Sequence, residues 1–298
     1  MESEKRRFFL VVNLIAGQGR CKTLFPKVKA ELDRRRIDYD VHYTNEPLEA
    51  TDAARMGLEA GFEYLVAVGG DGTVNEVVNG IVGSNATLGV IPAGTGNDFV
   101  RMVGIPSDPF RAIDVLVRGR PRRIDLGRVA DDRYFVNGLG IGIDAQVARD
   151  VLEMKRLRGA LAYLAAAVKE VFRFQPFPVT LTTDGTAEER TYLSLGFANG
   201  KFCGGGFKLA PRALLTDGMI DVAGIEDFPK LMRLLRLPQA RAGAHLGLRQ
   251  VHYRQVREVT ASSDTDLVAH MDGEAYKLPK PSFRVEAVPD ALSLLSPS

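Results

Sequence analysis

Within residues 1–122, hydrophobic residues occur in two patterns, as short runs typical of strands and at the spacing typical of helices. The alternation of these two patterns predicts a parallel sheet. Short apolar runs typical of buried strands occupy residues 8–13, 65–68 and 87–91, and residues 39–44 are a further predicted strand. Between them, apolar side chains recur at helical spacing. The predicted helices include residues 25–32, 48–60 and 73–82, a short stretch from Phe99, and residues 109–118. Strands alternating with helices indicate a doubly wound α/β domain over residues 1–122, with residues 288–298 as a candidate return to it.

The pattern changes near residue 123 and becomes that of alternating strands. The predicted strands are residues 123–129, 134–143, 179–183, 191–197, 219–225, 256–261, 267–271 and 283–287. Asp184-Gly185 is a hairpin turn pair between two of them. Helical spacing interrupts the strands at residues 159–174 and 228–237. We therefore predict a second, antiparallel β domain over residues 123–287.

A glycine-rich turn joins the third predicted strand to its helix. Its five residues are Gly69, Gly70, Asp71, Gly72 and Thr73. Free backbone N–H groups and the positive end of the helix dipole favour phosphate at such a turn, and glycines allow the phosphate to approach closely. A carboxylate beside phosphates suggests that Mg²⁺ is also present. The alternative is a plain strand-to-helix turn in which the glycines serve only the geometry.

A second glycine loop, Pro-Ala-Gly-Thr-Gly-Asn-Asp, follows the fourth predicted strand. Thr95 lies within it, and Asn97 and Asp98 open the next helix, as capping residues do. Both loops lie at the carboxyl edge of the predicted sheet, where they could hold the two ends of one nucleotide. Asp71 and Asp98 could then share a water-bound Mg²⁺. Taken alone, this loop is equally consistent with a capped turn.

Composition narrows the class of protein. The chain has 298 residues, 45% of them hydrophobic, and a net charge of +2, which is too small for general nucleic-acid binding. The two cysteines, Cys21 and Cys203, have no metal-ligand spacing and suit a reducing, cytoplasmic setting. No stretch approaches the ~20 apolar residues of a membrane span. We therefore expect any membrane contact to be peripheral.

The glycine loops and several later motifs resemble the diacylglycerol kinase catalytic family of lipid kinases, in its soluble bacterial branch, which also includes relatives of sphingosine kinase. The matching motifs lie at residues 69–75 (GGDGTVN), 94–99 (GTGNDF), 199–211 (NGKFCGGGFKLAP), 217–222 (DGMIDV), 243–245 and 272–274. Leu14 departs from the family, which usually has proline in an Asn-Pro-x-Ser-Gly loop. The matches run almost from end to end.

The resemblance implies a nucleotide-binding domain of the NAD kinase/diacylglycerol kinase type and a β-sandwich domain, with the active site in the cleft between them. It also implies that ATP is the phosphate donor. The nucleotide contacts that it adds to the two loops are Asn13, Gly17, Thr44 and Asn75. Thr44 is nearly as well explained as an ordinary hydroxyl at the end of a strand.

The resemblance further implies a proton acceptor and a structural metal site in the second domain. Glu274 is the implied general base, and Asp272 is close enough to share that role. Asp217 is implied to bind Mg²⁺ together with the backbone carbonyls of Leu214 and Met219. Without the resemblance, an exposed acidic turn and an ordinary turn aspartate are the better interpretations.

Residues 229–257 carry seven lysines and arginines and no acidic residue, and leucines lie among them. This pattern is typical of an element that sits on an anionic bilayer, although a basic face over an ordinary core helix explains it equally well. Aromatic residues are sparse there, which argues against nucleic acid. We expect a lipid substrate at the inner face of the membrane, whereas association into a homodimer stays open.

These observations predict an ATP- and Mg²⁺-dependent kinase that phosphorylates the hydroxyl of a diacylglycerol-like lipid. One alternative is an NAD kinase, whose superfamily shares the first glycine loop. The motifs at residues 94–99 and 199–222 point away from it. The other alternative is a non-catalytic nucleotide-sensing, membrane-associated module. The presence of Asp71, Asp98, Asp217 and Glu274 together argues against lost catalysis.

Overall fold

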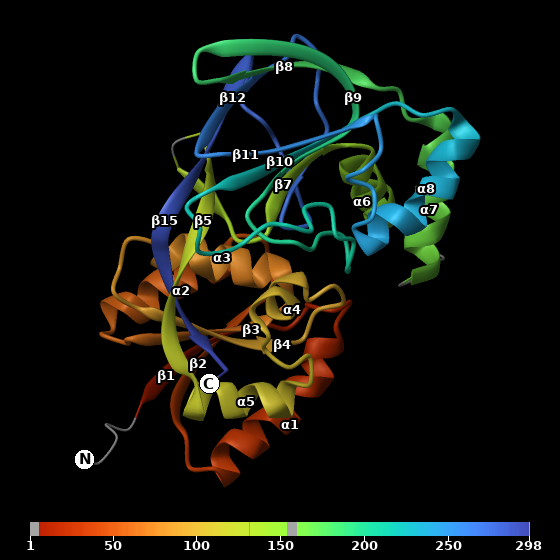
Figure 1. The fold of residues 1–298 in the computed structure, drawn as a ribbon. Helices are drawn as coiled ribbons and strands as arrows, with labels where there is room; N and C mark the ends of the chain where they lie inside the picture. Colours follow the sequence, from red (N-terminus) through yellow and green to blue (C-terminus); the bar gives the residue numbers. More distant parts are fainter. Residues whose placement is uncertain (1–5, 131, 154–159, 298) are drawn as a thin grey trace. The chain divides into compact units, whose positions relative to one another are not determined.

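The computed structural model describes residues 6–130, 132–153 and 160–297. The chain divides into two compact units: unit 1 contains Met1–Ile124 and Asp290–Ser298, and unit 2 contains Asp125–Pro289. Two strands carry the chain from one unit into the other, β5 (Arg120–Val129) and β15 (Ser282–Ser296) (Figure 1).

Unit 1 is the predicted doubly wound α/β domain. Its strands are β1 (Arg7–Asn13), β2 (Asp38–Thr44), β3 (Tyr64–Gly69) and β4 (Thr87–Pro92), and they pair in parallel in the order β2-β1-β3-β4. The last residues of β15 add a further parallel strand beside β4. The helices are α1 (Arg20–Arg34), α2 (Glu49–Glu59), α3 (Asp71–Ile81), α4 (Asp98–Val103) and α5 (Pro109–Arg118). Figure 1 shows α2 and α3 on one face of this sheet and α1 and α5 on the other.

The core of unit 1 explains why its inner strands β1, β3 and β4 are apolar runs, unlike the edge strand β2. Leu65, Val66 and Val68 on β3 are fully buried because helices cover both faces of a parallel sheet. The helices bury only one stripe each, as Val28 and Leu32 do on α1. The apolar runs in the sequence therefore correspond to the strands, and the helical spacing of apolar residues corresponds to the helices.

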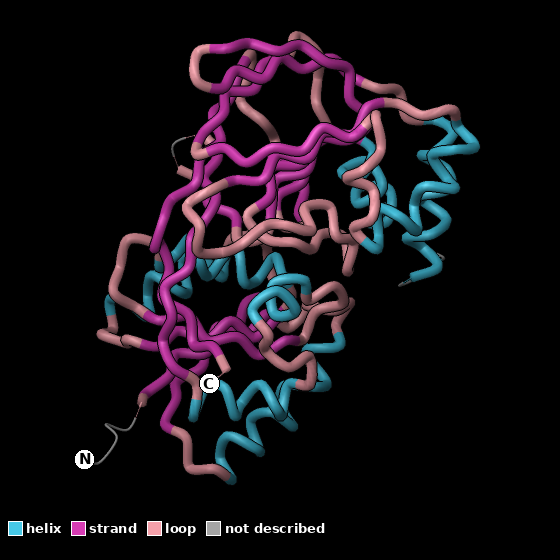
Figure 2. Tube along the Cα trace, in the orientation of Figure 1, coloured by secondary structure: helices cyan, strands magenta, loops and turns pink. Residues whose placement is uncertain are grey.

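Unit 2 is dominated by antiparallel strands, and its helices are α6 (Ile143–Glu153), α7 (Ala160–Arg173) and α8 (Lys230–Ala242) (Figure 2). The strands are β6 (Arg133–Phe135), β7 (Gly138–Gly142), β8 (Phe177–Thr183), β9 (Thr186–Ala198), β10 (Ile220–Glu226), β11 (Val251–Val256), β12 (Glu258–Ser262), β13 (Ala269–Met271) and β14 (Glu274–Tyr276). The main strand order is β14-β13-β7-β9-β8-β12-β15. Asp184 and Gly185 form the predicted hairpin turn, both at positive φ.

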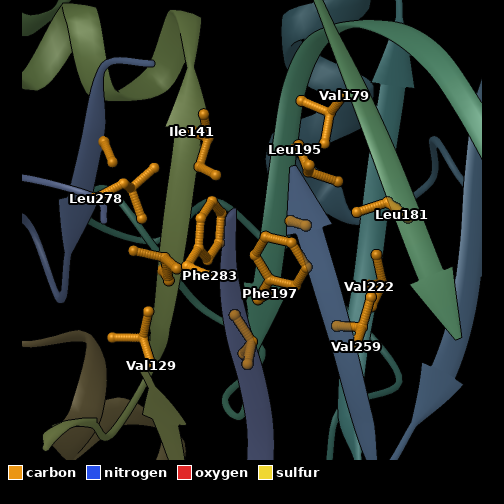
Figure 3. Packing of buried hydrophobic residues seen from close by; sticks show 14 of the residues in the cluster. Val129, Ile141, Val179, Leu181, Leu195, Phe197, Val222, Val259, Leu278 and Phe283 are labelled. Carbon is orange, nitrogen blue, oxygen red and sulfur yellow. The ribbon is translucent and has the colours of Figure 1, made fainter. Parts of the chain in front are cut away.

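The inward faces of these strands form one apolar core, in which Phe197 and Phe283 meet edge to face with ring centroids 6.1 Å apart (Figure 3). Aromatic pairs favour this edge-to-face arrangement. The predicted β-sandwich domain is confirmed.

Two predicted strands of unit 2 are wrong in detail. The expected strand at residues 134–143 is divided into β6 and β7, because the N–H groups of Val136 and Asn137 donate to the side chain of Asp272. It ends at Gly142, where α6 begins without having been predicted. The expected strand at residues 256–261 is also divided: β11 pairs with β10, whereas β12 pairs with β8 and β15. Of the predicted helix at residues 159–174, residue 159 lies outside the described residues.

Candidate functional site

The two glycine loops of unit 1 lie directly against each other at the carboxyl edge of the sheet. The carbonyl of Gly69 accepts hydrogen bonds from the N–H groups of Ala93 (2.7 Å) and Gly94 (3.2 Å). A side chain at Gly94 would clash with the Cα atom of Gly70, so glycine is needed for this approach. The structure therefore brings together the two loops that the sequence treats separately.

Asp71 joins the same two loops through its side chain. Its Oδ1 atom accepts a hydrogen bond from the backbone N–H of Phe99 at 2.9 Å. Asp71 is also the first residue of α3, and the first-turn N–H groups of a helix have no intrahelical acceptor. The half-buried carboxylate of Asp71 thus lies at the N-terminus of α3, as the phosphate-loop hypothesis requires.

The loops after β1 and β2 converge on the same edge. The Asn13 side chain donates to the hydroxyl of Thr73 at 3.1 Å, and Gly17, at φ +62°, packs against the carbonyl of Ala93. Thr44 is buried, and its hydroxyl lies 3.5 Å from the carbonyl of Val12. The predicted nucleotide contacts from all four loops therefore cluster at one edge of unit 1.

The remaining predicted nucleotide contacts differ in exposure. Thr95 is exposed, whereas Asn75 is buried and accepts a hydrogen bond from the Asn79 side chain at 3.2 Å. Asn97 precedes α4 as expected, but its side chain donates to the carbonyl of Gly94 at 3.0 Å instead of capping the helix. It stabilises the loop itself.

Asp98 is buried and forms an ion pair with Arg101, a residue that sequence reasoning missed. Arg101 also donates to the carbonyl of Gly96 at 3.2 Å. The spacing of three residues on a helix is the pattern that could have revealed this pair. Arg101 therefore ties the second glycine loop to α4.

The carboxylate turn of unit 2, which comprises residues 272–274, holds two acidic side chains in different environments. Asp272 is buried at positive φ, and its carboxylate accepts N–H bonds from Val136 (2.8 Å), Asn137 (2.8 Å) and Gly138 (2.9 Å). Glu274 is exposed at the start of β14. Asp272 therefore fixes the turn in place, and Glu274 projects from it toward solvent.

A buried histidine supports the same turn. His270 on β13 accepts the N–H of Gly273 at its Nδ1 atom (3.3 Å), and its Nε2 atom lies 3.1 Å from Oδ2 of Asp144. The hydroxyl of Ser194 donates to the other oxygen of Asp144 at 3.2 Å. Sequence reasoning missed this network, because Asp144 lies in the unpredicted helix α6.

The Asp217 turn carries the oxygen atoms of the predicted metal site. Asp217 accepts from the N–H of Met219 (3.1 Å) and from the Gln255 side chain (3.0 Å). Burial raises the pKa of the nearby Asp221, and the negative charge of Asp217 raises it further. Repulsion between two carboxylates suits a site that takes a hard cation.

No cluster of three histidine, cysteine, aspartate or glutamate side chains that could hold a metal is found within residues 6–130, 132–153 and 160–297. A cation at the Asp217 turn would therefore depend on backbone carbonyls, as the resemblance implies for Leu214 and Met219. Leu214 is half exposed. The oxygen-only donor set fits Mg²⁺.

The basic segment at residues 229–257 includes one arginine that the membrane hypothesis cannot use. Arg233 on α8 is buried, where it pairs with Asp227 and donates to the carbonyls of Val171 (2.9 Å) and Phe174 (3.0 Å) at the end of α7. It is a structural residue that satisfies the last carbonyls of a helix. Arg233 therefore does not belong to the basic surface that the sequence predicts for residues 229–257.

The exposed face of α8 carries both leucines and cations, which is the pattern that led to the membrane hypothesis. Leu231 and Leu235 are 64% and 59% exposed, and Lys230 and Arg241 are exposed on the same helix. None of the helices in the described part of the chain is long and apolar enough to cross a membrane.

Comparisons with known proteins agree with this architecture. Residues 7–129 match the family described as diacylglycerol kinase catalytic domain, and residues 138–296 match the YegS C-terminal NAD kinase beta sandwich-like domain. The chain is 31% identical over 287 residues to a diacylglycerol kinase of Staphylococcus saprophyticus, covering 92% of this chain and 91% of that protein.

A probable lipid kinase YegS-like of Chromohalobacter salexigens is 34% identical over 263 residues, covering 86% of this chain and 83% of that protein. Among solved structures, a diacylglycerol kinase from Bacillus anthracis has the same fold, with a TM-score of 0.72 at 20% identity. That match covers 98% of this chain and 97% of the other.

Proposed function

This chain belongs to the diacylglycerol kinase catalytic-domain family and is a lipid kinase, and we propose that it transfers the γ-phosphate of ATP, with Mg²⁺, to the hydroxyl of a diacylglycerol-like lipid. The observation that carries the proposal is the junction of the two glycine loops by Asp71 and the N–H of Phe99. A phosphate chain needs closely approaching backbone donors, and the junction places two sets of them side by side.

Unit 1 binds and orients the phosphate donor in this proposal. The N–H groups that open α3 face the phosphates, and Gly70 and Gly94 leave room for them. Asp71 keeps the two loops in register and contributes a carboxylate next to the phosphates. Mg²⁺, when bound with the nucleotide, neutralises phosphate charge and favours departure of ADP.

Unit 2 supplies the proton acceptor. Glu274 is the better candidate than Asp272, because three backbone N–H groups already occupy the Asp272 carboxylate. The Glu274 carboxylate takes the proton of the lipid hydroxyl as its oxygen bonds to the γ-phosphorus and the bond to ADP breaks. Asp272 serves as the anchor that holds the turn carrying Glu274.

The Asp217 turn is proposed to bind a separate, structural Mg²⁺. Asp217, whose side chain accepts from the N–H of Met219, would hold it together with the carbonyls of Leu214 and Met219. The carboxylates of Asp217 and Asp221 repel one another there, and a cation would relieve that repulsion. This ion stabilises unit 2 and takes no part in the transfer.

The lipid is proposed to be reached at an anionic bilayer surface on the cytoplasmic side. Leu231 and Leu235 on α8 would enter the interface, flanked by Lys230 and Arg241. Exposed leucines next to cations, in a segment without acidic residues, fit such a surface. The contact is peripheral.

The experiment that tests the function is transfer of radiolabelled γ-phosphate from ATP with Mg²⁺ to a panel of lipids in mixed micelles, with NAD in a parallel tube. The panel contains diacylglycerol, monoacylglycerol, phosphatidylglycerol and a sphingoid base. Label in diacylglycerol is the expected result. Label in NAD alone, or ATP binding without any labelled product, would contradict the proposal.

A further inference from the structure

The buried His270 connects the carboxylate turn to helix α6, although neither the histidine nor its partner has a role in the chemistry proposed above. His270 is 7% exposed and lies on β13 directly before the turn. One ring nitrogen contacts the Gly273 N–H, and the other contacts Asp144. Gly140 on β7 leaves room for the pair, because a side chain there would clash with both groups.

The two contacts define the protonation state of the ring. Nδ1 accepts from the Gly273 N–H, so it carries no proton, and the proton of the neutral imidazole is on Nε2, which donates to Asp144. A second proton could enter only at Nδ1. It would replace the acceptor by a donor that faces the N–H of Gly273, and this hydrogen bond would be lost.

We propose that Asp144 and His270 are positioning residues for Glu274, and that protonation of His270 releases the Gly273 amide and lowers the rate of phosphate transfer. The inference rests on the proposed function, since it assigns Glu274 the role of proton acceptor. Gly273 lies between the anchored Asp272 and Glu274, so its amide determines the direction in which Glu274 leaves the turn. The enzyme would therefore be less active in acid for a reason separate from titration of its own base.

The carboxylates around the ring favour a second proton. The pKa of His270 lies above its ordinary value of 6.5, because the carboxylates of Asp144 on α6 and Asp272 on the turn outweigh the burial that lowers it. Strand β7 offers glycine and apolar residues, β9 offers the Ser194 hydroxyl to Asp144, and β14 carries Glu274 and Tyr276.

Stability and activity are expected to change in opposite directions with pH. A histidine with a raised pKa in the folded state adds stability below the pKa of the unfolded chain, and this contribution is lost as pH rises through the folded value. Acidification therefore strengthens the pair with Asp144 but breaks the bond to Gly273. If His270 were merely structural, activity and stability would change in the same direction with pH.

Two substitutions separate the two ring contacts. His270→Asn keeps an acceptor at the Nδ1 position without a titrating group, and His270→Gln keeps a donor near the Nε2 position without that acceptor. We expect His270→Asn, which loses the contact with Asp144, to keep more of its kcat in alkaline buffer than His270→Gln does, and to move the acid limb of the rate profile to lower pH. We expect His270→Gln to lose about tenfold in kcat at every pH, with KM for ATP unchanged.

The measurement is kcat for diacylglycerol against pH in the intact wild-type protein and both variants, alongside the ¹⁵N shifts of the His270 ring and the Gly273 amide. The inference is supported if the Gly273 amide shifts with the same midpoint as the ring and the acid limb moves in His270→Asn. It is overturned if the Gly273 amide is unaffected while the ring titrates, or if wild type and His270→Asn share one acid limb. If the wild type phosphorylates no lipid, the proposed function fails, and the ¹⁵N titration still decides whether His270 controls the turn.

Discussion

The carboxyl edge of the sheet in unit 1, where the two glycine loops meet, and the carboxylate turn of unit 2 are built by different means. In unit 1, the contacts join segments that directly follow the strands, such as Gly69 with Ala93 and Gly94, and Asp71 with Phe99. In unit 2, side chains far apart in sequence make them: Asp272 binds residues 136–138, and His270 binds Asp144.

This difference shows which kind of site local sequence can encode. A strand followed by glycine and a helix brings its own N–H donors, so the motif and the geometry coincide. A buried carboxylate held by distant N–H groups depends on the register of several strands. We expect substitutions in unit 1 to act mainly on nucleotide binding, and those in unit 2 to separate into effects on rate and effects on stability.

The largest expected effect is at Asp71, where the two glycine loops meet. Asp71→Ala should reduce phosphate transfer about a thousandfold while the protein stays folded, because it removes a charge beside the phosphates and the bond to Phe99. The measurement is transfer to diacylglycerol together with thermal unfolding. Asp71→Asn is the matched control, since it keeps an acceptor for Phe99 without the charge. Near-normal transfer by Asp71→Ala would refute the phosphate-loop assignment.

Gly94 tests whether the close approach of the loops matters for the nucleotide. In Gly94→Ala the new methyl group meets the backbone of Gly70, and overpacking of this kind costs about 2 kcal/mol. We expect ATP affinity, measured by calorimetry, to fall roughly thirtyfold, which corresponds to the same energy. Gly247→Ala is the control, because its methyl group would meet no atom within 4 Å. Equal affinities of the two variants would show that the loops need no contact.

A substitution at Asp272 tests the claim that effects on rate and effects on stability arise from different residues of unit 2. Asp272→Asn leaves one of its backbone donors facing an amide N–H₂ group, so the free energy of unfolding should fall by about 2 kcal/mol. Urea denaturation measures this change, with Glu274→Gln as the exposed control that should alter it little. An Asp272→Asn protein as stable as the wild type would remove its role as anchor.

The smallest expected effect is at the outer face of α8. Lys230→Gln should weaken binding to anionic vesicles about fivefold, since each cation near such a surface contributes about 1 kcal/mol. Vesicle sedimentation measures it, and activity on detergent-dispersed lipid should be unchanged. Arg233→Met is the contrasting control, because loss of the buried cation should destabilise unit 2 without weakening vesicle binding by the folded protein. A parallel loss of detergent activity in Lys230→Gln would argue against a bilayer contact.

The sequence predicted unit 1 better than unit 2 for a physical reason. The strands and helices of unit 1 differ in period, and each predicted element is present in the structure. In unit 2, the break between β6 and β7 lies at Val136 and Asn137, which are held by hydrogen bonds with Asp272 and Asn199, residues far away in the sequence. No local pattern encodes such a break.

The same distinction applies to the candidate site. Gly69, Gly70 and Asp71 could be proposed from spacing alone, and the structure places them next to the second loop. The buried position of Arg233 could not be foreseen, because a basic run looks the same whether a cation faces solvent or the end of another helix. Asp144 and His270 carried no motif at all.

Glu274→Gln gives the most direct test of the claim that unit 1 binds the nucleotide and unit 2 accepts the proton. The measurement is the single-turnover rate of phosphate transfer to diacylglycerol, taken with the Kd for ATP and Mg²⁺ on the same preparation. Loss of a general base should lower the rate about a hundredfold and leave the Kd within about twofold of the wild type. An unchanged rate, or a Kd that weakens in proportion to the rate, would contradict the assignment of proton acceptance to unit 2 and nucleotide binding to unit 1.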